Sequence, residues 1–220
     1  MNKNENKKHD IFFISPVNGI SVADESNCRS YIGSRVDEGM KIYFPLDDTK
    51  QDGDFIGNRI CDDNLKAIRE SETVDLYLAK SSKGSFFDLG ASFYLDKLLY
   101  IVNPESLSSE DDMDLFIMNN SINVETETDS ILKEEFNDFN NRINNYNSNS
   151  IHEKNNKIIS LDFTYDKPTL FKFGMLYASG KPFVFNNIGS VEKTVGKSFQ
   201  NLAHHKHIEF AKNYQLDLFD

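Results

Sequence analysis

The chain has 220 residues, of which 39% are hydrophobic, and its 24 basic and 35 acidic residues give a net charge of −11 at pH 7. This length is enough for one domain, or for one domain with an appendage. Because an acidic surface repels phosphate backbones, the charge balance argues against proteins that hold duplex DNA or RNA in a basic groove.

Targeting signals and metal-binding cysteine patterns are missing from the sequence. No apolar run approaches the length that spans a bilayer, and the first ten residues are rich in Asn and Lys rather than apolar like a secretory signal. The two cysteines, Cys28 and Cys61, have no metal-site spacing, which is typical of reduced thiols. We therefore expect a cytoplasmic protein that is not associated with a membrane.

Short apolar segments that predict strands alternate with segments that predict helices. The predicted strands are residues 11–14, 41–44, 74–79, 98–102, 158–163 and 183–185. The predicted helices are residues 23–38, 58–71, 85–95 and 169–179, with a loop at 46–57. Continuous apolar runs are typical of buried parallel strands, and alternation with helices predicts a parallel sheet covered on both faces. The predicted fold class is α/β, a Rossmann-like or flavodoxin-like three-layer sandwich with a mainly parallel sheet.

The composition changes in the middle of the chain, where Ser, Asp, Glu and Asn dominate. Apolar residues at helical spacing between 131 and 143 predict one helix there. We interpret this region as an insertion rather than a domain. The predicted organisation is a flexible N-terminus (1–9), an α/β core (10–104), the Asn-rich insertion (105–157), a second strand–helix–strand region with a C-terminal helix (158–212) and a tail (213–220).

Two segments look like copies of one strand–helix–strand unit. The sequence Gly-Ser-Phe-Phe-Asp-Leu-Gly-Ala at 84–91 corresponds to Pro-Thr-Leu-Phe-Lys-Phe-Gly-Met at 168–175, and a Lys precedes the following strand in both copies. The alternative is that any two such units look alike. The matched Phe, Gly and Lys positions favour an internal repeat, in which Asp88 of the first copy corresponds to Lys172 of the second.

Asp88 is the most informative candidate for chemistry. Ligands of an open parallel sheet bind beyond the carboxyl ends of the strands, and the predicted loops at 15–18, 45–54, 79–85 and 103–104 lie there. We expect Asp88 in the first turn of its helix, where free N–H groups and the helix dipole favour an anion. A carboxylate that stays ionised in a cleft suits nucleophilic attack on a sugar C1. The alternative is an ordinary Asp that stabilises a helix end.

Several segments resemble the nucleoside 2-deoxyribosyltransferase-like family over about residues 10–103. They are residues 11–16, 44–48, 63–68, 74–79 and 82–91, together with Lys97 and the strand after it. In that family the acidic residue of a (Glu/Asp)-Leu-Gly motif attacks the anomeric carbon and expels the base, so the resemblance implies this role for Asp88. The glycosyl-enzyme then passes to another base, or to water in hydrolase relatives.

Two positions depart from the family pattern, and one expectation concerns assembly. Established transferases carry Glu where this chain has Asp88, and an Asp that contacts the sugar where it has Ser82. Family members are usually oligomers in which a neighbouring subunit completes the site. The internal repeat is an alternative source of that contribution within one chain.

Six of the predicted substrate-binding residues come from the loops named above, and the seventh, Asp63, lies in the predicted helix at 58–71. The seven are Ser15, Pro16, Asp47, Asp63, Ser82, Gly84 and Ser85. The Gly-Ser pair offers N–H donors for a phosphate or sugar hydroxyl at a helix start, although Gly-Ser is also a common turn. Asp63 lies one helical turn from Arg59, and an ordinary surface pair is the first interpretation of these two.

Three histidines near the end of the chain do not predict a metal site. His204, His205 and His207 point in different directions on a helix, and only Glu209 stands at a favourable spacing from one of them, His205. We predict no metal and no cofactor.

The last residues form a candidate ligand for another protein. Gln215, Leu216, Leu218 and Phe219 resemble the short peptide with which bacterial replication proteins engage the sliding clamp. A free tail presents such side chains to an apolar groove. The alternative is that they cover the core of the protein itself.

These observations favour cleavage or transfer at the N-glycosidic bond of a nucleoside or nucleotide, with Asp88 as nucleophile. The alternative is a non-catalytic nucleotide-binding, nucleotide-sensing or interaction protein, as a clamp partner would be.

Overall fold

A computed structural model describes residues 7–17, 19–54, 56–79, 84–125, 131–146, 159–186 and 198–213. The strands are β1 (His9–Ile14), β2 (Ile42–Tyr43), β3 (Ser71–Leu76), β4 (Leu98–Ile101), β5 (Ile159–Leu161) and β6 (Phe183–Phe185). The helices are α1 (Val22–Asp37), α2 (Pro45–Asp48), α3 (Asn58–Glu70), α4 (Gly84–Tyr94), α5 (Asp112–Asn119), α6 (Ile131–Asn144), α7 (Lys167–Ser179) and α8 (Ser198–Asn213), with a 3-10 turn at Pro104–Ser106. In the described part of the chain, no helix combines the length and the apolar character needed to cross a membrane.

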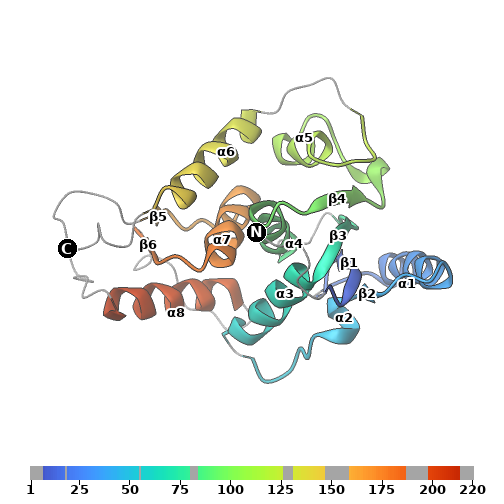
Figure 1. The fold of residues 1–220 in the computed structure, drawn as a ribbon, viewed down its shortest axis with the longest axis horizontal. Helices are drawn as coiled ribbons and strands as arrows, with labels where there is room; N and C mark the ends of the chain where they lie inside the picture. The colour runs from blue at the N-terminus through green and yellow to red at the C-terminus, as the bar shows by residue number, and fades with distance from the viewer. Residues whose placement is uncertain are drawn as a thin grey trace.

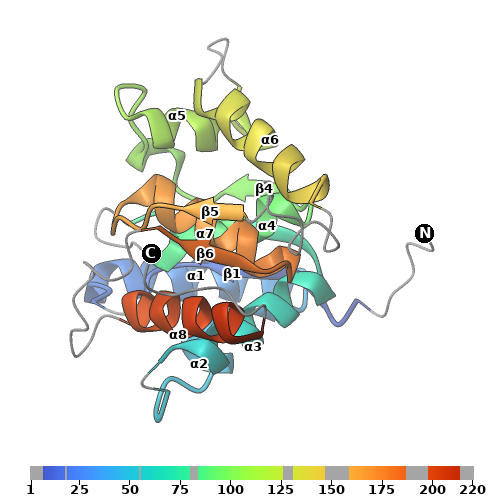
Figure 2. The ribbon, with the colours of Figure 1, turned by 90° about the vertical axis from the view of Figure 1, so that its left-hand side faces the viewer.

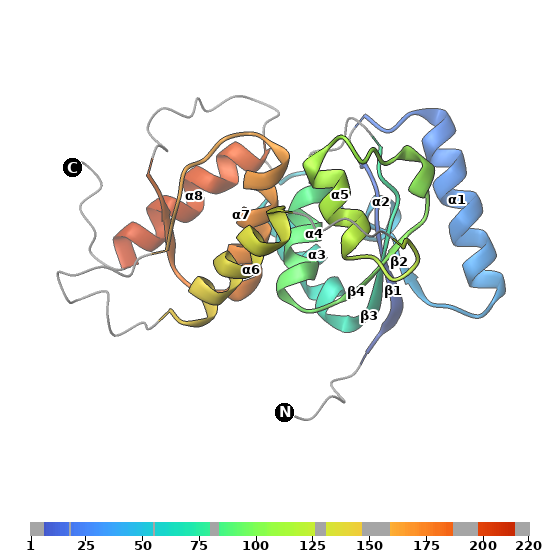
Figure 3. The ribbon, with the colours of Figure 1, turned by 90° about the horizontal axis from the view of Figure 1, so that it is seen from above.

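The main sheet is parallel and has the strand order β2-β1-β3-β4 (Figure 1). Helix α1 lies on one face, and α3 and α4 lie on the other, as seen from above in Figure 3. This order confirms the predicted α/β class and is that of flavodoxin-like folds. In such folds the strand order reverses at β1 and β3, and ligands bind at the carboxyl ends beside that reversal.

The apolar runs are buried because both faces of the sheet are covered. Phe12 and Ile14 pack toward α3 and α4, while Phe13 packs with Cys28 of α1 on the opposite face. Successive side chains of a strand point to opposite faces, so a strand covered on both sides must be apolar at every position. The prediction of a buried parallel strand at the start of the chain is therefore confirmed.

A second strand–helix–strand unit follows, as the repeat predicts. Strands β5 and β6 pair in parallel, and Leu161 pairs with Phe185 as Leu76 pairs with Ile101 in the first unit. These two strands form a separate sheet. Helices α4 and α7 pack against each other between the two sheets (Figure 3).

The repeat is longer than the sequence predicts, because α6 precedes β5 as α3 precedes β3, and α8 follows β6 as α5 follows β4. Figures 1 and 2 show α5 and α6 on one side of the central helix pair and α3 and α8 on the other. The buried positions of α3 match those of α6, with Cys61, Asn64 and Ile68 in α3 and Phe136, Phe139 and Ile143 in α6. The prediction of an insertion with one helix was wrong, since two helices form there and join the duplicated fold.

The element bounds also differ from the prediction in the segment after β2. Residues predicted as loop form the short helix α2, which has Pro45 at its start. The Asp48 carboxylate accepts a hydrogen bond from the Phe44 backbone N–H at 2.7 Å, so it satisfies a donor that the helix start leaves free. This turn brings Thr49 back toward the sheet, where it is buried.

Candidate functional site

Asp88 lies in the second turn of α4, which begins at Gly84 beyond the carboxyl end of β3. The prediction that it lies in the first turn was therefore wrong. Its side chain is partly buried, and burial raises the pKa of its carboxyl to about 7, against the opposing effect of a hydrogen bond from Asn64. The helix start thus does not keep this group ionised. Near neutral pH both the acid and the carboxylate are populated.

Asn64 holds the Asp88 carboxylate from the neighbouring helix. Its amide nitrogen lies 3.2 Å from Oδ2 and 3.4 Å from Oδ1 of Asp88. Asn64 is itself buried on the face of α3 that packs toward α4. An amide donor aimed at both oxygens restricts the rotation of the carboxyl group and favours its charged form.

A chain of hydrogen bonds fixes the amide of Asn64 in turn. The Thr49 hydroxyl donates to Asn64 Oδ1 at 2.9 Å, and the Tyr43 hydroxyl lies 2.8 Å from Thr49 Oγ1. Because Thr49 has a single hydroxyl proton, which goes to Asn64, Tyr43 is the donor to Thr49. The amide oxygen of Asn64 is thereby directed toward Thr49, and its NH2 group toward Asp88. Residues from β2, the end of α2, α3 and α4 thus converge on one carboxylate.

Ser15 and Pro16 follow β1 at the point where the strand order reverses, and both are buried. The Ser15 hydroxyl makes no hydrogen bond within the described residues. A buried hydroxyl without a hydrogen-bond partner is uncommon in proteins. The substrate-binding role of Ser15 and Pro16 stays a prediction from the sequence.

Gly84 and Ser85 form the first turn of α4, and Ser85 is buried. A Cβ on Gly84 would lie 3.3 Å from the Phe199 ring of α8. The second half of the repeat therefore contacts the start of the helix that carries Asp88. Ser82 lies outside the described residues.

Asp47 and Asp63 are engaged in ion pairs away from the Asp88 carboxylate. Arg29 of α1 binds both oxygens of Asp47, at 2.9 and 3.1 Å. Arg59 pairs with Asp63 at 3.3 Å, with side chains 39% and 46% exposed, so the interpretation as a surface pair is confirmed. The structure brings neither residue into contact with Asp88.

Sequence reasoning selected Asp63 and missed its neighbour Asn64. The buried residues of α3 include Cys61, Asn64, Leu65 and Ile68, which recur at helical spacing. A polar side chain on an apolar helix face is the signal that would have identified Asn64, because a buried amide must find partners.

The corresponding place in the second half has different chemistry. Lys172, which takes the place of Asp88, donates to Glu135 of α6 and lies over the rings of Phe136 and Phe139 at 6.0 and 5.8 Å. Phe139 occupies the position of Asn64, so this half has neither the carboxylate nor its amide donor. The described residues thus provide an Asp88-type arrangement in the first half alone.

The histidines of α8 have structural partners. The Nδ1 atom of His207 accepts a hydrogen bond from the Phe185 backbone N–H at 3.1 Å, and His205 lies 4.0 Å from Glu209. Within the described residues, no cluster of three or more His, Cys, Asp or Glu side chains is arranged to hold a metal ion. The predicted clamp-binding residues, 215–219, lie outside the described residues.

No protein-family model, curated protein or solved structure matches this chain. The relation to the nucleoside 2-deoxyribosyltransferase-like family therefore stays a prediction from the sequence.

Proposed function

We propose that this protein cleaves or transfers the N-glycosidic bond of a nucleoside or nucleotide, with Asp88 as the nucleophile. The observation that carries the proposal is the carboxylate of Asp88, held by the Asn64 amide at the end of the hydrogen-bond chain from Tyr43. A nucleophile must be held in one orientation to attack along the line of the bond that it breaks.

The proposed reaction has two steps. A carboxylate oxygen of Asp88 forms a bond to C1 of the sugar while the C–N bond breaks, and the bonding electrons leave on the base, which takes up a proton. A second base, or water, then attacks C1 and releases the carboxylate, so that the sugar is transferred or hydrolysed. Ser15 is a hydrogen-bond partner for the sugar in this scheme, since its hydroxyl lies buried at the reversal of strand order.

The ionisation of Asp88 suits a reaction at neutral pH. Burial raises the pKa of its carboxyl to about 7, and a less acidic carboxyl gives a more nucleophilic carboxylate. Because only the ionised form attacks, the rate of base release should rise with pH through this range. At lower pH the protonated acid should be inactive.

The decisive experiment is incubation with a panel of deoxynucleosides and their monophosphates, with released base measured by chromatography. We expect base release that Asp88→Ala abolishes. Asp37→Ala, which removes an exposed carboxylate at the end of α1, is the matched control and should retain the rate. Tight binding of a nucleotide without base release would replace the enzyme by a non-catalytic nucleotide-binding protein.

We also propose the tail as a ligand of the replication sliding clamp, on the sequence of residues 215–219 alone. The test is retention of the full chain on an immobilised bacterial clamp, compared with a chain that ends at Tyr214. Equal retention of both chains would remove this proposal.

A further inference from the structure

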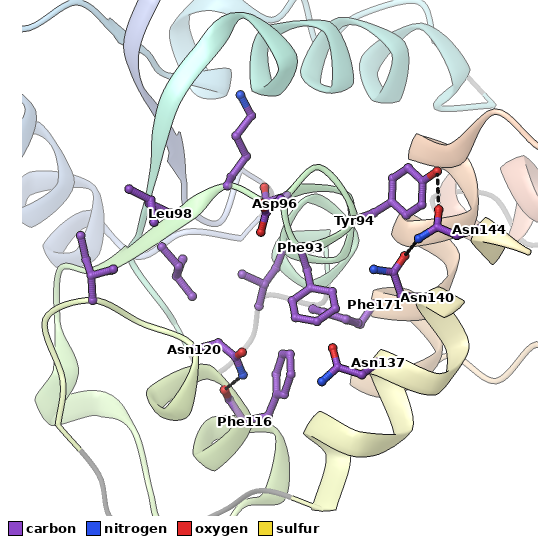
Figure 4. A pocket seen from close by; sticks show the side chains of 15 residues that line it. Phe93, Tyr94, Asp96, Leu98, Phe116, Asn120, Asn137, Asn140, Asn144 and Phe171 are labelled. Atoms are coloured by element: carbon purple, nitrogen blue, oxygen red, sulfur yellow. Dashed lines mark hydrogen bonds between the residues drawn. The ribbon is translucent and has the colours of Figure 1, made fainter. Parts of the chain in front are cut away.

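A pocket of about 550 Å³ lies beside the end of α4 (Figure 4). Leu98, the first residue of β4, is at its rim, so the pocket is at the amino end of this strand. Rings of Phe93, Phe116 and Phe171 form its apolar part. A volume of this size accommodates a small organic molecule.

Amide side chains form the polar part of the pocket. Helix α6 contributes Asn137, Asn140 and Asn144, which recur at helical spacing on one face, and Asn120 follows α5 (Figure 4). Asn144 donates to Asn140 at 3.3 Å, and Asn120 donates to the Phe116 carbonyl at 2.7 Å. The Asn137 side chain makes no hydrogen bond within the described part of the chain.

In the other half of the repeat, hydrogen bonds and packing fill the place that corresponds to this pocket. Tyr177 of α7 takes the place of Phe93, and its hydroxyl donates to the Asp62 carboxylate of α3 at 2.5 Å. The Lys206 ammonium group of α8 lies 5.3 Å from the centre of the Tyr177 ring. A tyrosine hydroxyl, an acceptor on the flanking helix and a cation thus join the helices around this ring.

In the pocket half the tyrosine of α4 is Tyr94, one residue after Phe93, and its hydroxyl donates to Asn144 of α6 at 3.4 Å, so this hydrogen bond does not involve the ring at position 93 (Figure 4). The matched burial of α3 and α6 puts Asn137 at the position of Asp62. Phe93 has no hydroxyl to give to Asn137, and its ring is only partly buried. The pocket is therefore the open counterpart of a space that a hydrogen bond closes in the second half.

We infer that this pocket binds a nucleobase, whether free or as part of a nucleoside. An amide both donates and accepts, and it can pair with the edge of a base through two hydrogen bonds. The partly exposed Phe93 ring offers a stacking surface for a planar ring.

The charges at the pocket favour a neutral ligand. The Lys97 ammonium group donates to the backbone carbonyls of Arg69 and Ser71, so it is engaged by the protein. The carboxylate at the pocket belongs to Asp96, which is exposed at the end of α4. Among the described residues that line the pocket there are four amides, and the one cation, Lys97, is bound by backbone carbonyls, which suits an uncharged ring rather than a phosphate.

The test is calorimetric titration of the full chain with adenine, uracil and thymine, and with the corresponding nucleosides. We expect at least one base to bind, and Asn137→Leu to weaken its affinity at least tenfold. Phe93→Tyr should weaken it as strongly, because the added hydroxyl can donate to Asn137 as Tyr177 donates to Asp62. The matched control is Tyr177→Phe, which alters the other half and should leave base affinity within twofold of the wild type.

Three results would overturn the inference. One is the absence of binding of every base at millimolar concentration, with thermal melting showing the chain folded. Another is base binding that neither Asn137→Leu nor Phe93→Tyr changes. Competition by a neutral hexose at equal concentration would assign the pocket to sugars and would also overturn it.

The inference does not depend on the proposed glycosidic chemistry. Binding that depends on Asn137 should persist in Asp88→Ala, because Asp88 does not line this pocket. A protein that releases no base from nucleosides but still binds a base through Asn137 would contradict the proposed function alone.

Discussion

Gly90 of α4 and Gly174 of α7 are each pressed against the backbone of the other helix, in a reciprocal contact. A Cβ at Gly90 would lie 1.9 Å from the Phe171 carbonyl oxygen, and a Cβ at Gly174 would lie 1.9 Å from the Phe87 carbonyl oxygen. The two glycines occupy equivalent positions of the repeat, as do the two phenylalanines. The halves of the chain therefore pack as the subunits of a two-fold dimer do. The Phe199 ring beside Gly84 shows that the second half of the same chain supplies a side chain at the start of α4.

Replacing either glycine of this crossing should strongly destabilise the protein. Gly90→Ala places a methyl group where the opposing carbonyl oxygen stands, so the helices must separate. We expect a loss of about 3 kcal/mol in the free energy of unfolding, measured by urea denaturation. Gly174→Ala should lose a similar amount, because its contact with Phe87 is equivalent.

Gly33 of α1 provides the control for this prediction. A Cβ there meets no atom within 4 Å, so alanine fits without strain. Gly33→Ala should raise the free energy of unfolding by about 0.5–1 kcal/mol through helix propensity. Equal effects of alanine at positions 33 and 90 would contradict the tight crossing.

The raised pKa of Asp88 should make the native state less stable as the pH increases. An unfolded Asp ionises near pH 3.8, whereas burial raises the pKa of Asp88 to about 7 in the folded chain. Between these values the folded state holds a proton that the unfolded state has released, so stability falls as the pH rises and the loss is complete above pH 7. Asp88→Asn cannot ionise. We expect it to exceed the wild type in stability by on the order of 1 kcal/mol at pH 8, and by much less at pH 5. A stability difference between Asp88→Asn and the wild type that does not vary with pH would show that the pKa of Asp88 is not raised in the folded protein.

Asn64 should control the pKa of Asp88. Its hydrogen bond lowers that pKa against the effect of burial, so Asn64→Leu should raise the pKa of Asp88 further. The carboxyl resonance of Asp88 in a 13C NMR titration measures the shift directly. If base release is detected, the midpoint of its acid limb should move by the same amount.

Thr49→Val tests whether Thr49 acts on Asp88 only by orienting the side-chain amide of Asn64. It removes the donor to Asn64 Oδ1 but keeps the Asn64 amide nitrogen beside Asp88. We expect a stability loss of about 1 kcal/mol and a smaller change in the pKa of Asp88 than Asn64→Leu causes. If Thr49→Val changes the pKa of Asp88 more than Asn64→Leu does, then Thr49 influences Asp88 by a route other than its hydrogen bond to Asn64.

The two cysteines should be unreactive in the folded protein. Both are free and buried, and burial raises the pKa of Cys28 to about 12 and that of Cys61 well above its ordinary value. Because the thiolate is the reactive form, a thiol-specific chromophoric reagent at pH 8 should modify neither residue until urea unfolds the chain. Rapid modification of the native protein would show that one thiol is accessible.

Much of the fold follows from local patterns. The run at 11–14 is apolar at every position, which requires a strand covered on both faces, and the structure confirms it as part of β1. The strand β6 has the predicted bounds, and α1, α3 and α4 begin or end within one residue of them. Helix α5 was missed because it has eight residues among acidic neighbours, and its apolar residues Met113, Phe116 and Ile117 become significant only when they pack.

The sequence by itself determined the alternation of strands and helices and the repeated strand–helix–strand unit, because both depend on residue types at regular spacing. Only the tertiary structure decided that Asn64 rather than Asp63 faces the carboxylate of Asp88. It also decided that the hydrogen bonds from Tyr43 through Thr49 orient the Asn64 amide. Adjacent residues of a helix point about a quarter of a turn apart, and the choice between them is made by what packs against the helix. The reciprocal contact of Gly90 and Gly174 likewise depends on two segments that are distant in sequence, since a close approach of backbones needs both partners in place.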